Sequence, residues 1–462
     1  MNFFIKYIEV IFLNIKTDSR KIKAGDTFVA LRGYGKDGHE YILDAIRKGA
    51  SKVVVEEGLY DVETLVVKDT KEYLIKYLHD NYYEQIKDIE LIGVTGTNGK
   101  TTTCFLIYEA LNKLNIKCAY IGTVGFYLDK KVRDLNNTTP DILEIYELLL
   151  ECKAKGYIHV VMEVSSHALA MKRTEGLLYD LAIFTNLTKE HQDYHKTMEN
   201  YALAKQKLFY KLKENGKTII NNDDLYKDYF LKENSLTYGF SSSDYQITEY
   251  KTDGDITSFL VKHNNQINEF KMKLIGKHNI YNMLSVIIYL KIINIDIDKI
   301  KQIIASLDPP IGRMDKINYK DNMIIVDYAH TPDATENIIS AVKSLNYNNI
   351  YTIIGCGGER DKEKRPLMGK IATDLSDYVI LTSDNPRMED PKQIIDDMIQ
   401  NLDNKNYEIV INRKNAINKG IQKLVKNDIL LILGKGHEKY QVIGKEKIDF
   451  DDKKIVLDII RR

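Results

Sequence analysis

From about Ile89 onward, short apolar runs alternate along the chain with longer segments whose apolar residues recur at helical spacing. This alternation is typical of βαβ units and a parallel sheet. A chain of 462 residues also exceeds what one hydrophobic core usually supports, and at roughly 150 residues per domain about three domains are expected. The sequence therefore predicts an α/β protein of three domains.

The last third of the chain shows the alternation most clearly, because polar sequence follows directly after four of its apolar runs. In an open parallel sheet, ligands bind beyond the carboxyl ends of the strands. We therefore expect these four polar segments to gather at one edge of the sheet. The predicted strands are Met323–Val326, Ile350–Ile354, Tyr378–Leu381, Glu408–Ile411 and Ile429–Leu433, separated by predicted helices at Thr335–Leu345, Pro366–Leu375 and Pro391–Leu402. The polar segments are Asp327-Tyr-Ala-His-Thr-Pro332, Gly355-Cys-Gly-Gly-Glu-Arg-Asp-Lys362, Ser383-Asp-Asn-Pro-Arg387 and Gly434-Lys-Gly-His-Glu438.

The middle third repeats the pattern, and a smaller unit precedes it. We place the domain boundaries near residues 88 and 309, which gives domains 1–88, 89–309 and 310–462. The predicted strands of the middle domain are Glu90–Val94, Cys118–Ile121, Ile158–Val164, Leu181–Phe184 and Thr218–Ile220.

Composition excludes several classes of function. Lys+Arg and Asp+Glu both total 66, so a generic binder of nucleic acid or anionic membrane is not expected. The four cysteines are scattered without a Cys-x-x-Cys pair, which argues against a zinc knuckle, an iron–sulfur cluster or a disulfide framework. The apolar segment Met1–Leu13 is interrupted by Lys6 and Glu9, and no later window approaches a membrane span. We expect a cytoplasmic protein without membrane insertion.

A glycine-rich segment links a predicted strand to a predicted helix: Gly93-Val-Thr-Gly-Thr-Asn-Gly-Lys-Thr-Thr-Thr103. Backbone N–H groups at a helix N-terminus suit phosphate oxygens, Lys100 adds a positive charge, and the Thr101 hydroxyl can ligate Mg²⁺. Val94 stands where the strict phosphate-loop pattern has its first glycine, so this is a variant loop. The alternative is a glycine-rich turn with an exposed lysine.

Three further residues of the middle domain are candidates for nucleotide chemistry. Glu163 ends an apolar strand, where an unpaired carboxylate would cost several kcal/mol, so a cation such as Mg²⁺ is a natural partner. A neighbouring lysine or backbone donors could satisfy it instead. His191 could be a second Mg²⁺ ligand, although a lone histidine is more often structural. Lys205, read by itself, is an exposed helical lysine.

Two arginines and a glutamate follow strands of the last domain. The planar guanidinium of Arg387 matches a carboxylate, and Arg360 could face the same ligand. Glu438 could partner an ammonium, so the three together suggest a zwitterionic ligand. A solvated network of ion pairs is the alternative.

These motifs resemble the Mur ligase family of ATP-dependent ligases, which add amino acids to peptidoglycan precursors. The resemblance runs from Asp18-Ser-Arg20 to Gly434-Lys-Gly-His-Glu438, nearly the whole chain. The segment Gly96-Thr-Asn-Gly-Lys-Thr101 occurs throughout the family and in the related folylpolyglutamate synthetases. The motifs that narrow the resemblance to members adding the third amino acid are Asn137-Thr-Thr-Pro140, Glu163-Val-Ser-Ser-His167, Tyr328-Ala-His-Thr-Pro332 and Ser383-Asp-Asn-Pro-Arg387.

The resemblance implies an N-terminal domain that holds a uridine nucleotide, a central ATPase domain of phosphate-loop type and a Rossmann-like C-terminal domain that brings the amino acid. By motif match, ATP would contact Gly96, Thr97, Asn98, Gly99, Lys100, Thr101, Thr102, Asn279, Asn282, Arg313 and His330. Mg²⁺ would be held by Thr101, Glu163, His191 and Lys205, the last as an N6-carboxylysine carbamate, and the catalytic residues would be Lys100, Glu163, His191 and Lys205. The UDP-N-acetylmuramoyl-dipeptide would contact Ser19, His39, Thr138, Thr139, Ser165 and Arg173.

The resemblance also implies the amino acid that is added. Asp384-Asn-Pro-Arg387 accompanies meso-diaminopimelate in the family, whereas lysine-adding relatives usually lack the arginine. Diaminopimelate has a distal carboxylate that lysine lacks, and a desolvated guanidinium without it would remain unpaired. The pocket would consist of Arg360, Asp384, Asn385, Arg387, Gly434 and Glu438.

Two departures from the family pattern bear on the site. The usual Asp-His-Leu-Asp segment is Glu190-His-Gln-Asp193 here, which alters the setting of His191. Met171 and Lys172 stand just before Arg173, where a glutamine is common in relatives, so the resemblance does not supply that contact to the dipeptide here.

We therefore expect a monomeric ligase that joins UDP-N-acetylmuramoyl-L-alanyl-D-glutamate to meso-diaminopimelate through an acyl phosphate, with ATP as co-substrate. The alternatives are the same reaction with L-lysine, a folylpolyglutamate-type ligase, and a nucleotide switch that hydrolyses ATP without making a product.

Overall fold

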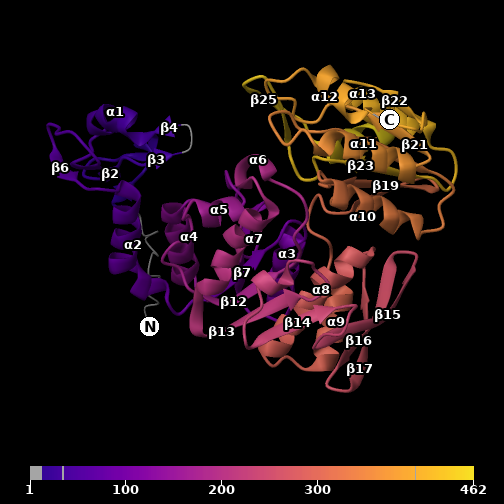
Figure 1. Cartoon of the computed structure of the whole chain (residues 1–462), viewed down its shortest axis with the longest axis horizontal. Coiled ribbons are helices and arrows are strands. Elements are labelled where there is room, and N and C mark those ends of the chain that lie inside the picture. The colour runs from indigo at the N-terminus through magenta and orange to yellow at the C-terminus, as the bar shows by residue number, and fades with distance from the viewer. Residues whose placement is uncertain (1–12, 34–35, 401, 462) are drawn as a thin grey trace, which may run out of the picture. The chain divides into compact units, whose positions relative to one another are not determined.

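The computed structural model describes residues 13–33, 36–400 and 402–461 (Figure 1). The first twelve residues of the apolar segment Met1–Leu13 lie outside these ranges. The described chain divides into two compact units, each assembled from separate segments. The first contains the described part of Met1–Gly93 together with Asn115–Leu181 and Tyr210–Gly216, and the second contains Val94–Leu114, Ala182–Phe209 and the described part of Lys217–Arg462. The chain passes between them within β7 (Glu90–Thr95), β12 (Tyr179–Phe184) and β13 (Leu212–Asn221).

The first unit begins with a small parallel sheet in the order β1-β2-β5-β6. Phe28, Ala30, Val53 and Val55 form its core with residues of the following helix. Asp69 caps the long helix α2 by accepting hydrogen bonds from two backbone N–H groups. The elements are β1 (Ile15–Lys16), β2 (Thr27–Val29), β3 (Arg32–Gly33), β4 (Lys36–Asp37), α1 (Ile42–Arg47), β5 (Lys52–Val55), β6 (Glu63–Val66) and α2 (Thr70–Ile86).

The rest of the first unit carries strands in the order β10-β9-β8-β11, of which β8 and β11 are parallel. The apolar strand β11 ends at Glu163, and Ser165 then caps the short helix α5. Polar groups therefore collect where this strand ends. The elements are β8 (Cys118–Gly122), β9 (Gly125–Tyr127), β10 (Lys131–Arg133), α4 (Ile142–Ala154), β11 (His159–Glu163) and α5 (Ser166–Ala170).

The second unit contains the segment that follows β7 and an antiparallel meander that the apolar-run pattern did not predict. Strands β15, β16 and β17 pair antiparallel, and side chains along β16 alternate between buried and exposed positions. The elements are α3 (Lys100–Lys113), α6 (Gln192–His195), α7 (Met198–Gln206), β14 (Ser235–Gly239), β15 (Tyr245–Asp253), β16 (Ile256–His263), β17 (Gln266–Met272), α8 (Lys277–Ile292) and α9 (Ile297–Ser306).

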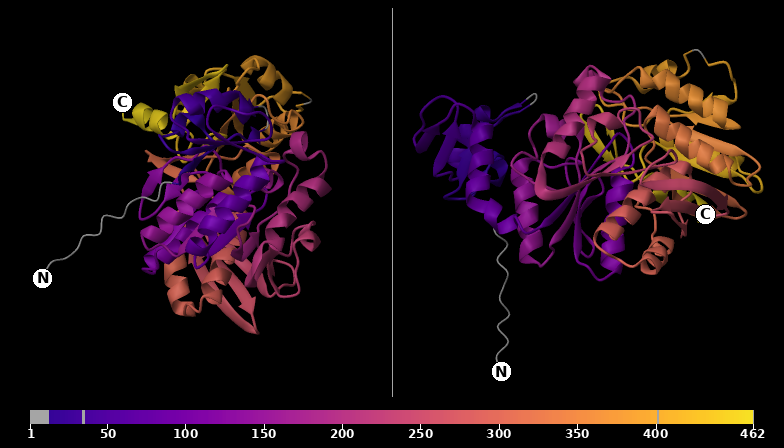
Figure 2. Two further views of the ribbon diagram at one scale, coloured as in Figure 1. Left: turned by 90° about the vertical axis from the view of Figure 1, so that its left-hand side faces the viewer. Right: turned by 60° about the horizontal axis from the view of Figure 1, so that its bottom comes forward.

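The second unit ends with a six-stranded sheet in the order β18-β19-β23-β20-β21-β22, coloured orange to yellow in Figures 1 and 2. All five predicted strands are present, and they pair in parallel. β18 adds an antiparallel edge. The strands are β18 (Asp315–Tyr319), β19 (Asn322–Asp327), β20 (Ile350–Ile354), β21 (Tyr378–Leu381), β22 (Tyr407–Ile409) and β23 (Ile429–Leu433), and a hairpin of β24 (Tyr440–Ile443) and β25 (Glu446–Asp449) follows.

Helices cover both faces of this sheet, because its strands are apolar on both sides. Ile429 and Leu431 of β23 pack with α10, α11 and α12, whereas Leu430 and Ile432 pack with α13 and α14. β19, β23, β20 and β21 are neighbours, so the four polar segments that follow them share one edge, which confirms that expectation. The helices are α10 (Pro332–Lys343), α11 (Lys364–Leu375), α12 (Pro391–Met398), α13 (Arg413–Lys423) and α14 (Asp452–Ile460).

Two other expectations concern the whole chain. Cys104, Cys118, Cys152 and Cys356 are all buried, and none of them forms a disulfide bond. Among the helices that the structure describes, none has the length and apolar content needed to cross a membrane.

Candidate active site

The glycine-rich loop after β7 forms the turn into α3, as predicted for a phosphate loop. Gly99 adopts a left-handed conformation with φ of 86°, and a Cβ there would lie 2.4 Å from Oδ1 of Asn282. Thr101 and Thr102 are buried in the first turn of α3. The backbone at this helix N-terminus therefore has the geometry that favours phosphate oxygens.

Two lysines converge on one carbonyl of this loop. Lys100 Nζ donates to the main-chain oxygens of Gly96 and Thr97, each at 2.8 Å, and Lys205 Nζ donates to the same Gly96 oxygen at 2.7 Å. Lys205 is 1% exposed, so its interpretation as an exposed helical lysine is wrong. Burial and the nearby Lys100 charge hold the pKa of Lys205 well below its usual range. Its ammonium therefore gives up a proton more readily than that of an exposed lysine.

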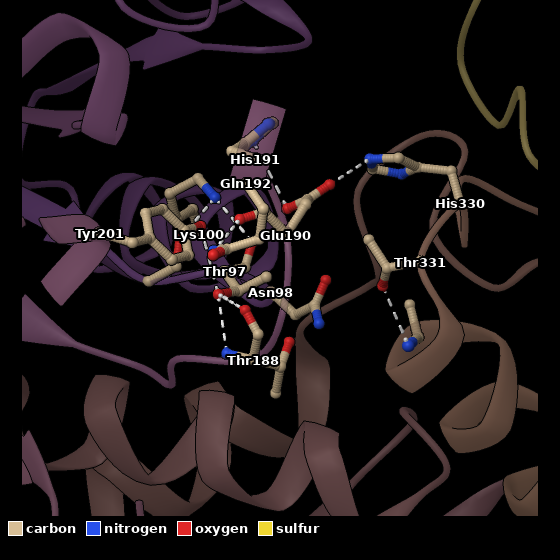
Figure 3. A network of polar contacts seen from close by, with 12 residues as sticks. Thr97, Asn98, Lys100, Thr188, Glu190, His191, Gln192, Tyr201, His330 and Thr331 are labelled. Carbon is tan, nitrogen blue, oxygen red and sulfur yellow. Dashed lines mark hydrogen bonds and ion pairs between the residues drawn. The ribbon is translucent and has the colours of Figure 1, made fainter. Parts of the chain in front are cut away.

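A polar network surrounds the loop (Figure 3). The Thr97 hydroxyl lies 3.2 Å from the Tyr201 hydroxyl and accepts from the Thr188 N–H at 3.0 Å. Asn98 Nδ2 donates to Asp333 Oδ2 at 2.7 Å, which links the loop to the first turn of α10. The loop is thus held by side chains from several elements of the second unit.

Glu190 is a member of this network that the motif match did not assign. It is 7% exposed, and its carboxylate oxygens lie 3.2 Å from Nε2 of His330 and 3.5 Å from Nε2 of His191 (Figure 3). Burial alone would raise its pKa, but His191, His330 and Lys364 together hold the pKa of Glu190 well below its usual range. In the sequence, position 190 could have been noticed because a glutamate stands there in place of the first aspartate of the family's Asp-His-Leu-Asp pattern.

The remaining predicted ATP residues of the second unit lie on α8 and on the segment before β18. Asn282 Nδ2 donates to Asn279 Oδ1 at 3.1 Å, and both side chains are buried. Arg313 Nη2 donates to Thr101 Oγ1 at 3.2 Å, and its guanidinium stacks 4.6 Å from the centre of the Tyr328 ring. Arg313 therefore contacts the first turn of α3, and the Asn282 amide lies beside Gly99 in the turn that precedes this helix.

Three of the four predicted Mg²⁺ ligands fit that ion in kind. A threonine hydroxyl, a carboxylate and a carbamate are hard oxygen ligands, which Mg²⁺ prefers, whereas His191 would contribute an imidazole nitrogen. Across residues 13–33, 36–400 and 402–461, no three His, Cys, Asp or Glu side chains gather as a metal cage.

In the first unit, Glu163 is satisfied by donors at the end of β8. The Tyr120 hydroxyl and the Thr123 N–H donate to Oε1, the latter at 2.9 Å, and the Thr123 hydroxyl donates to Oε2 at 3.1 Å. The Thr123 N–H is a backbone donor, as the alternative interpretation of Glu163 described, whereas the two hydroxyl donors were not predicted. A metal contact at Glu163 stays a prediction.

The residues predicted to hold the dipeptide gather around Glu163. Thr139 Oγ1 donates to the Glu163 carbonyl at 2.8 Å and accepts from the Ser165 N–H at 3.0 Å, and the Thr138 hydroxyl lies 3.0 Å from that of Thr123. Arg173 Nη1 donates to the Thr139 carbonyl at 3.2 Å. The structure thus brings four predicted residues together: Thr138, Thr139, Ser165 and Arg173.

A lysine of α2 joins this cluster and was not predicted. Lys71 Nζ donates to the carbonyl of Met171, and burial lowers the pKa of Lys71. Lys172 pairs with Glu72 of α2. Met171 and Lys172, which depart from the family pattern before Arg173, therefore both contact residues of α2.

Among the described residues, Ser19 and His39 contact others of the N-terminal segment and none of the residues of this cluster. The Ser19 hydroxyl donates to Asp44 at 2.7 Å. His39 Nδ1 lies 2.6 Å from Asp37 Oδ1, and its Nε2 accepts from the Glu56 N–H at 3.0 Å. The second contact requires an unprotonated Nε2, so both ring nitrogens of His39 already have protein partners.

The strand-end loops of the C-terminal sheet bring charged and polar side chains together at the predicted amino-acid pocket. Asn385 Nδ2 donates to Glu438 Oε2 at 2.9 Å. Arg387 Nη1 donates to the Gly358 carbonyl at 2.6 Å, and its main chain has a left-handed φ of 52°. Asp384 is 8% exposed, and its Oδ2 has no hydrogen-bond partner among the described residues.

Glycine is needed at position 434, and Arg360 lies at the margin of the pocket. Gly434 has φ of 115°, and a Cβ there would lie 2.7 Å from Asp384 Oδ2. Arg360 is exposed and donates to the Glu359 carbonyl at 2.9 Å. The orphaned Asp384 oxygen, Glu438 and Arg387 therefore offer both charges to a zwitterionic ligand.

Comparisons with known proteins agree with these features. Sequence models of the Mur ligase family match three segments: the catalytic domain at residues 12–82, the middle domain at 94–290 and the glutamate ligase domain at 312–436. The chain is 42% identical to the UDP-N-acetylmuramoyl-L-alanyl-D-glutamate--2,6-diaminopimelate ligase of Clostridium perfringens, over 97% of this chain and 94% of that protein. The chain belongs to the Mur ligase family. It is therefore an ATP-dependent amide ligase.

Other members of the Mur ligase family extend the likeness. The ligase of the same name from Fusobacterium nucleatum is 42% identical, again over 97% of this chain and 94% of that protein. A solved structure of a UDP-N-acetylmuramoyl-L-alanyl-D-glutamate--2,6-diaminopimelate ligase has a TM-score of 0.68 and 32% identity, and covers 97% of this chain and 95% of that one. The fold is also shared with MurF ligase from Thermotoga maritima in complex with ADP, at a TM-score of 0.68, 19% identity and 98% coverage of each chain.

Proposed function

We propose that the protein adds meso-diaminopimelate to UDP-N-acetylmuramoyl-L-alanyl-D-glutamate in peptidoglycan precursor synthesis, with ATP as co-substrate. The relatives at 42% identity are named for this pair of substrates, which supports the proposal. The observation that carries it is the pocket at the edge of the C-terminal sheet, where Arg387 lies beside Asp384, Asn385 and Glu438.

Arg387 favours diaminopimelate over L-lysine, the alternative substrate. Its side chain is partly buried, burial lowers the pKa of the guanidinium, and its hydrogen bonds go to the neutral carbonyls of Gly358 and Asn385. The distal carboxylate of diaminopimelate would give it a directly bonded anion, whereas lysine would leave the guanidinium without that partner. Asp384 and Glu438 would accept from ammonium groups, and Gly434 would leave room for the ligand.

The reaction would proceed through an acyl phosphate. The D-glutamyl side-chain carboxylate attacks the γ-phosphorus of ATP, and ADP leaves. The amine of the diamino acid attacks the activated carbonyl, and the tetrahedral intermediate collapses to an amide with release of phosphate. Lys100 would stabilise charge on the transferred phosphoryl group, so that catalysis is mainly positioning and electrostatics.

Mg²⁺ would be held by Thr101, Glu163, His191 and carbamylated Lys205, and when bound it would neutralise phosphate charge. CO₂ reacts with the uncharged form of an amine, and the lowered pKa of the buried Lys205 favours that form. ATP would otherwise contact the loop residues and the side chains of α8, Arg313 and His330. The dipeptide would contact the cluster of Thr138, Thr139, Ser165 and Arg173, and the uridine nucleotide would lie near Ser19 and His39.

We also propose that the protein acts in the cytoplasm as a monomer with three functional domains, 1–88, 89–309 and 310–462. The three matched family segments support this division. Four buried cysteines that form no disulfide bond suit a reducing compartment.

Phosphate release tests the proposal directly. The full chain is given ATP, Mg²⁺ and UDP-N-acetylmuramoyl-L-alanyl-D-glutamate with meso-diaminopimelate, with L-lysine or with no acceptor, and the amide product is identified by mass. Release that depends on meso-diaminopimelate is expected. Release with L-lysine alone would overturn the role given to Arg387, and release without an acceptor would indicate a nucleotide switch.

A further inference from the structure

A lysine lies fully buried at the base of the amino-acid pocket. Lys435 follows β23 and is 0% exposed. Its Nζ lies 3.1 Å from Asn385 Oδ1 and 2.9 Å from Glu438 Oε2. A buried ammonium is costly unless an anion and hydrogen-bond acceptors compensate it, and here both partners are predicted ligands of the amino acid. Lys435 itself was not among the predicted binding residues.

Lys435 fixes the direction of the Asn385 amide. Asn385 Oδ1 accepts from Lys435 and from the Val442 N–H of β24, the latter at 3.0 Å, while Nδ2 donates to Glu438. Both donors must face the oxygen, so the amide cannot be reversed. Only an N–H of Asn385 therefore remains for a ligand, and the ligand group that it meets must be an acceptor.

Glu438 is fixed in a similar way. Its Oε2 receives both Lys435 and Asn385, whereas Oε1 has no hydrogen-bond partner among the described residues. Asp384 Oδ2 is also without a partner there. Two carboxylate oxygens are thus left for ammonium groups, and their positions follow from contacts made by the protein alone.

The charge of Lys435 also bears on which ligand is favoured. Asp384 and Glu438 carry negative charge, and Arg387 and Lys435 carry positive charge, so these four groups sum to zero; the exposed Arg360 adds a positive charge at the margin. Diaminopimelate, with two carboxylates and two ammonium groups, is neutral, whereas L-lysine carries a net positive charge. Removing Lys435 makes the pocket more negative by one charge, which favours the more cationic ligand.

We propose that Lys435 is a positioning residue that sets selectivity for a neutral diamino diacid over a cationic diamino acid. It does so through two partners, by orienting Asn385 and by occupying one oxygen of Glu438. This inference rests on the proposed function, since it concerns the amino acid that the ligase adds.

The test compares three variants in the full chain. Lys435→Gln keeps a hydrogen-bond donor and removes the charge, Lys435→Arg keeps the charge, and Lys439→Gln removes an exposed lysine four residues away as the matched control. For each, kcat and KM are measured for meso-diaminopimelate, L-lysine and ATP, together with the thermal midpoint.

In Lys435→Gln, we expect the KM for meso-diaminopimelate to rise about tenfold or more, with the KM for ATP within about twofold of wild type. The ratio of kcat/KM for L-lysine to that for meso-diaminopimelate should rise by a similar factor. Lys435→Arg should retain most of the selectivity, and Lys439→Gln should behave as wild type.

Unchanged selectivity in a folded Lys435→Gln variant would overturn the inference. If that variant does not fold, Lys435→Arg decides, because loss of selectivity with the charge retained would also overturn it. A parallel fall of all constants together with the thermal midpoint would mean a structural role only. If the proposed function itself fails, wild type makes no product with meso-diaminopimelate, which is a different result from any of these.

Discussion

The phosphate loop and the amino-acid pocket both contain lysines, but their partners differ. Lys100 contacts main-chain carbonyls of its own loop. Lys435 contacts the side chains of Asn385 and Glu438, one of them an anion. The first arrangement places a cation at the phosphate loop, and the second uses a cation to position the side chains that would bind the amino acid. We therefore expect changes at the loop to affect the rate, and changes at the pocket to affect the choice of substrate.

The largest expected effect is at the phosphate loop. Lys100→Met should lower kcat for phosphate release by about 10³-fold, because charge that develops on the transferred phosphoryl group loses its cation. Lys113→Met, on the same helix, is the control and should retain activity. Equal kcat in both variants would mean that the two lysine sites do not differ as described.

The buried ion pair at the end of β23 should matter for stability. Arg413 and Asp452 form a fully buried ion pair with contacts of 2.9 and 2.7 Å, and Arg413 also donates to the carbonyl of Leu433 at 2.9 Å. Arg413→Met leaves Asp452 buried without its partner and should lower the free energy of unfolding by about 3 kcal/mol in urea denaturation.

An exposed ion pair provides the control for that measurement. Lys392→Met breaks the pair with Asp396 on α12 and should cost under about 1 kcal/mol. A similar loss of free energy of unfolding in both variants would indicate that the buried Arg413–Asp452 pair contributes no more to stability than the exposed pair.

Arg387 tests selectivity against rate. Arg387→Met should lower kcat/KM for meso-diaminopimelate by about 10²-fold, because the distal carboxylate loses its bidentate partner. Activity with L-lysine should not fall in parallel. Arg360→Met, at the exposed margin, should have a smaller effect on the same ratio. An effect on L-lysine as large as that on meso-diaminopimelate would contradict a selective role for Arg387.

Much of this contrast could be predicted from the sequence. The strands of the C-terminal sheet are buried on both faces, so they appear as apolar runs, and the polar residues of the site follow directly after them. For this reason Asp384, Asn385 and Glu438 could be found from their positions after strand ends.

The burial of individual lysines could not be predicted. In the sequence, Lys205 and Lys435 look like ordinary charged residues, because the groups that they contact come from distant segments. Lys205 donates to the carbonyl of Gly96, and Lys435 donates to the side chain of Asn385. The β15–β17 meander was missed for a different reason. Its strands bury only alternate residues, and so they contain no continuous apolar run.

The smallest expected effect is a pH dependence of the loops beside the pocket. Arg365 binds Glu389 through two contacts of 2.9 Å, and this guanidinium lowers the pKa of Glu389 to about 2. A carboxyl whose pKa is lowered by folding stabilises the fold above its unfolded pKa of about 4.5, and this contribution is lost as the pH falls towards 2. Glu389→Gln lacks it, so urea denaturation should show the two proteins converging between pH 5 and pH 2, with wild type more stable above this window. If the free energies of unfolding of the two proteins instead ran parallel across this pH range, Arg365 would not lower the pKa of Glu389.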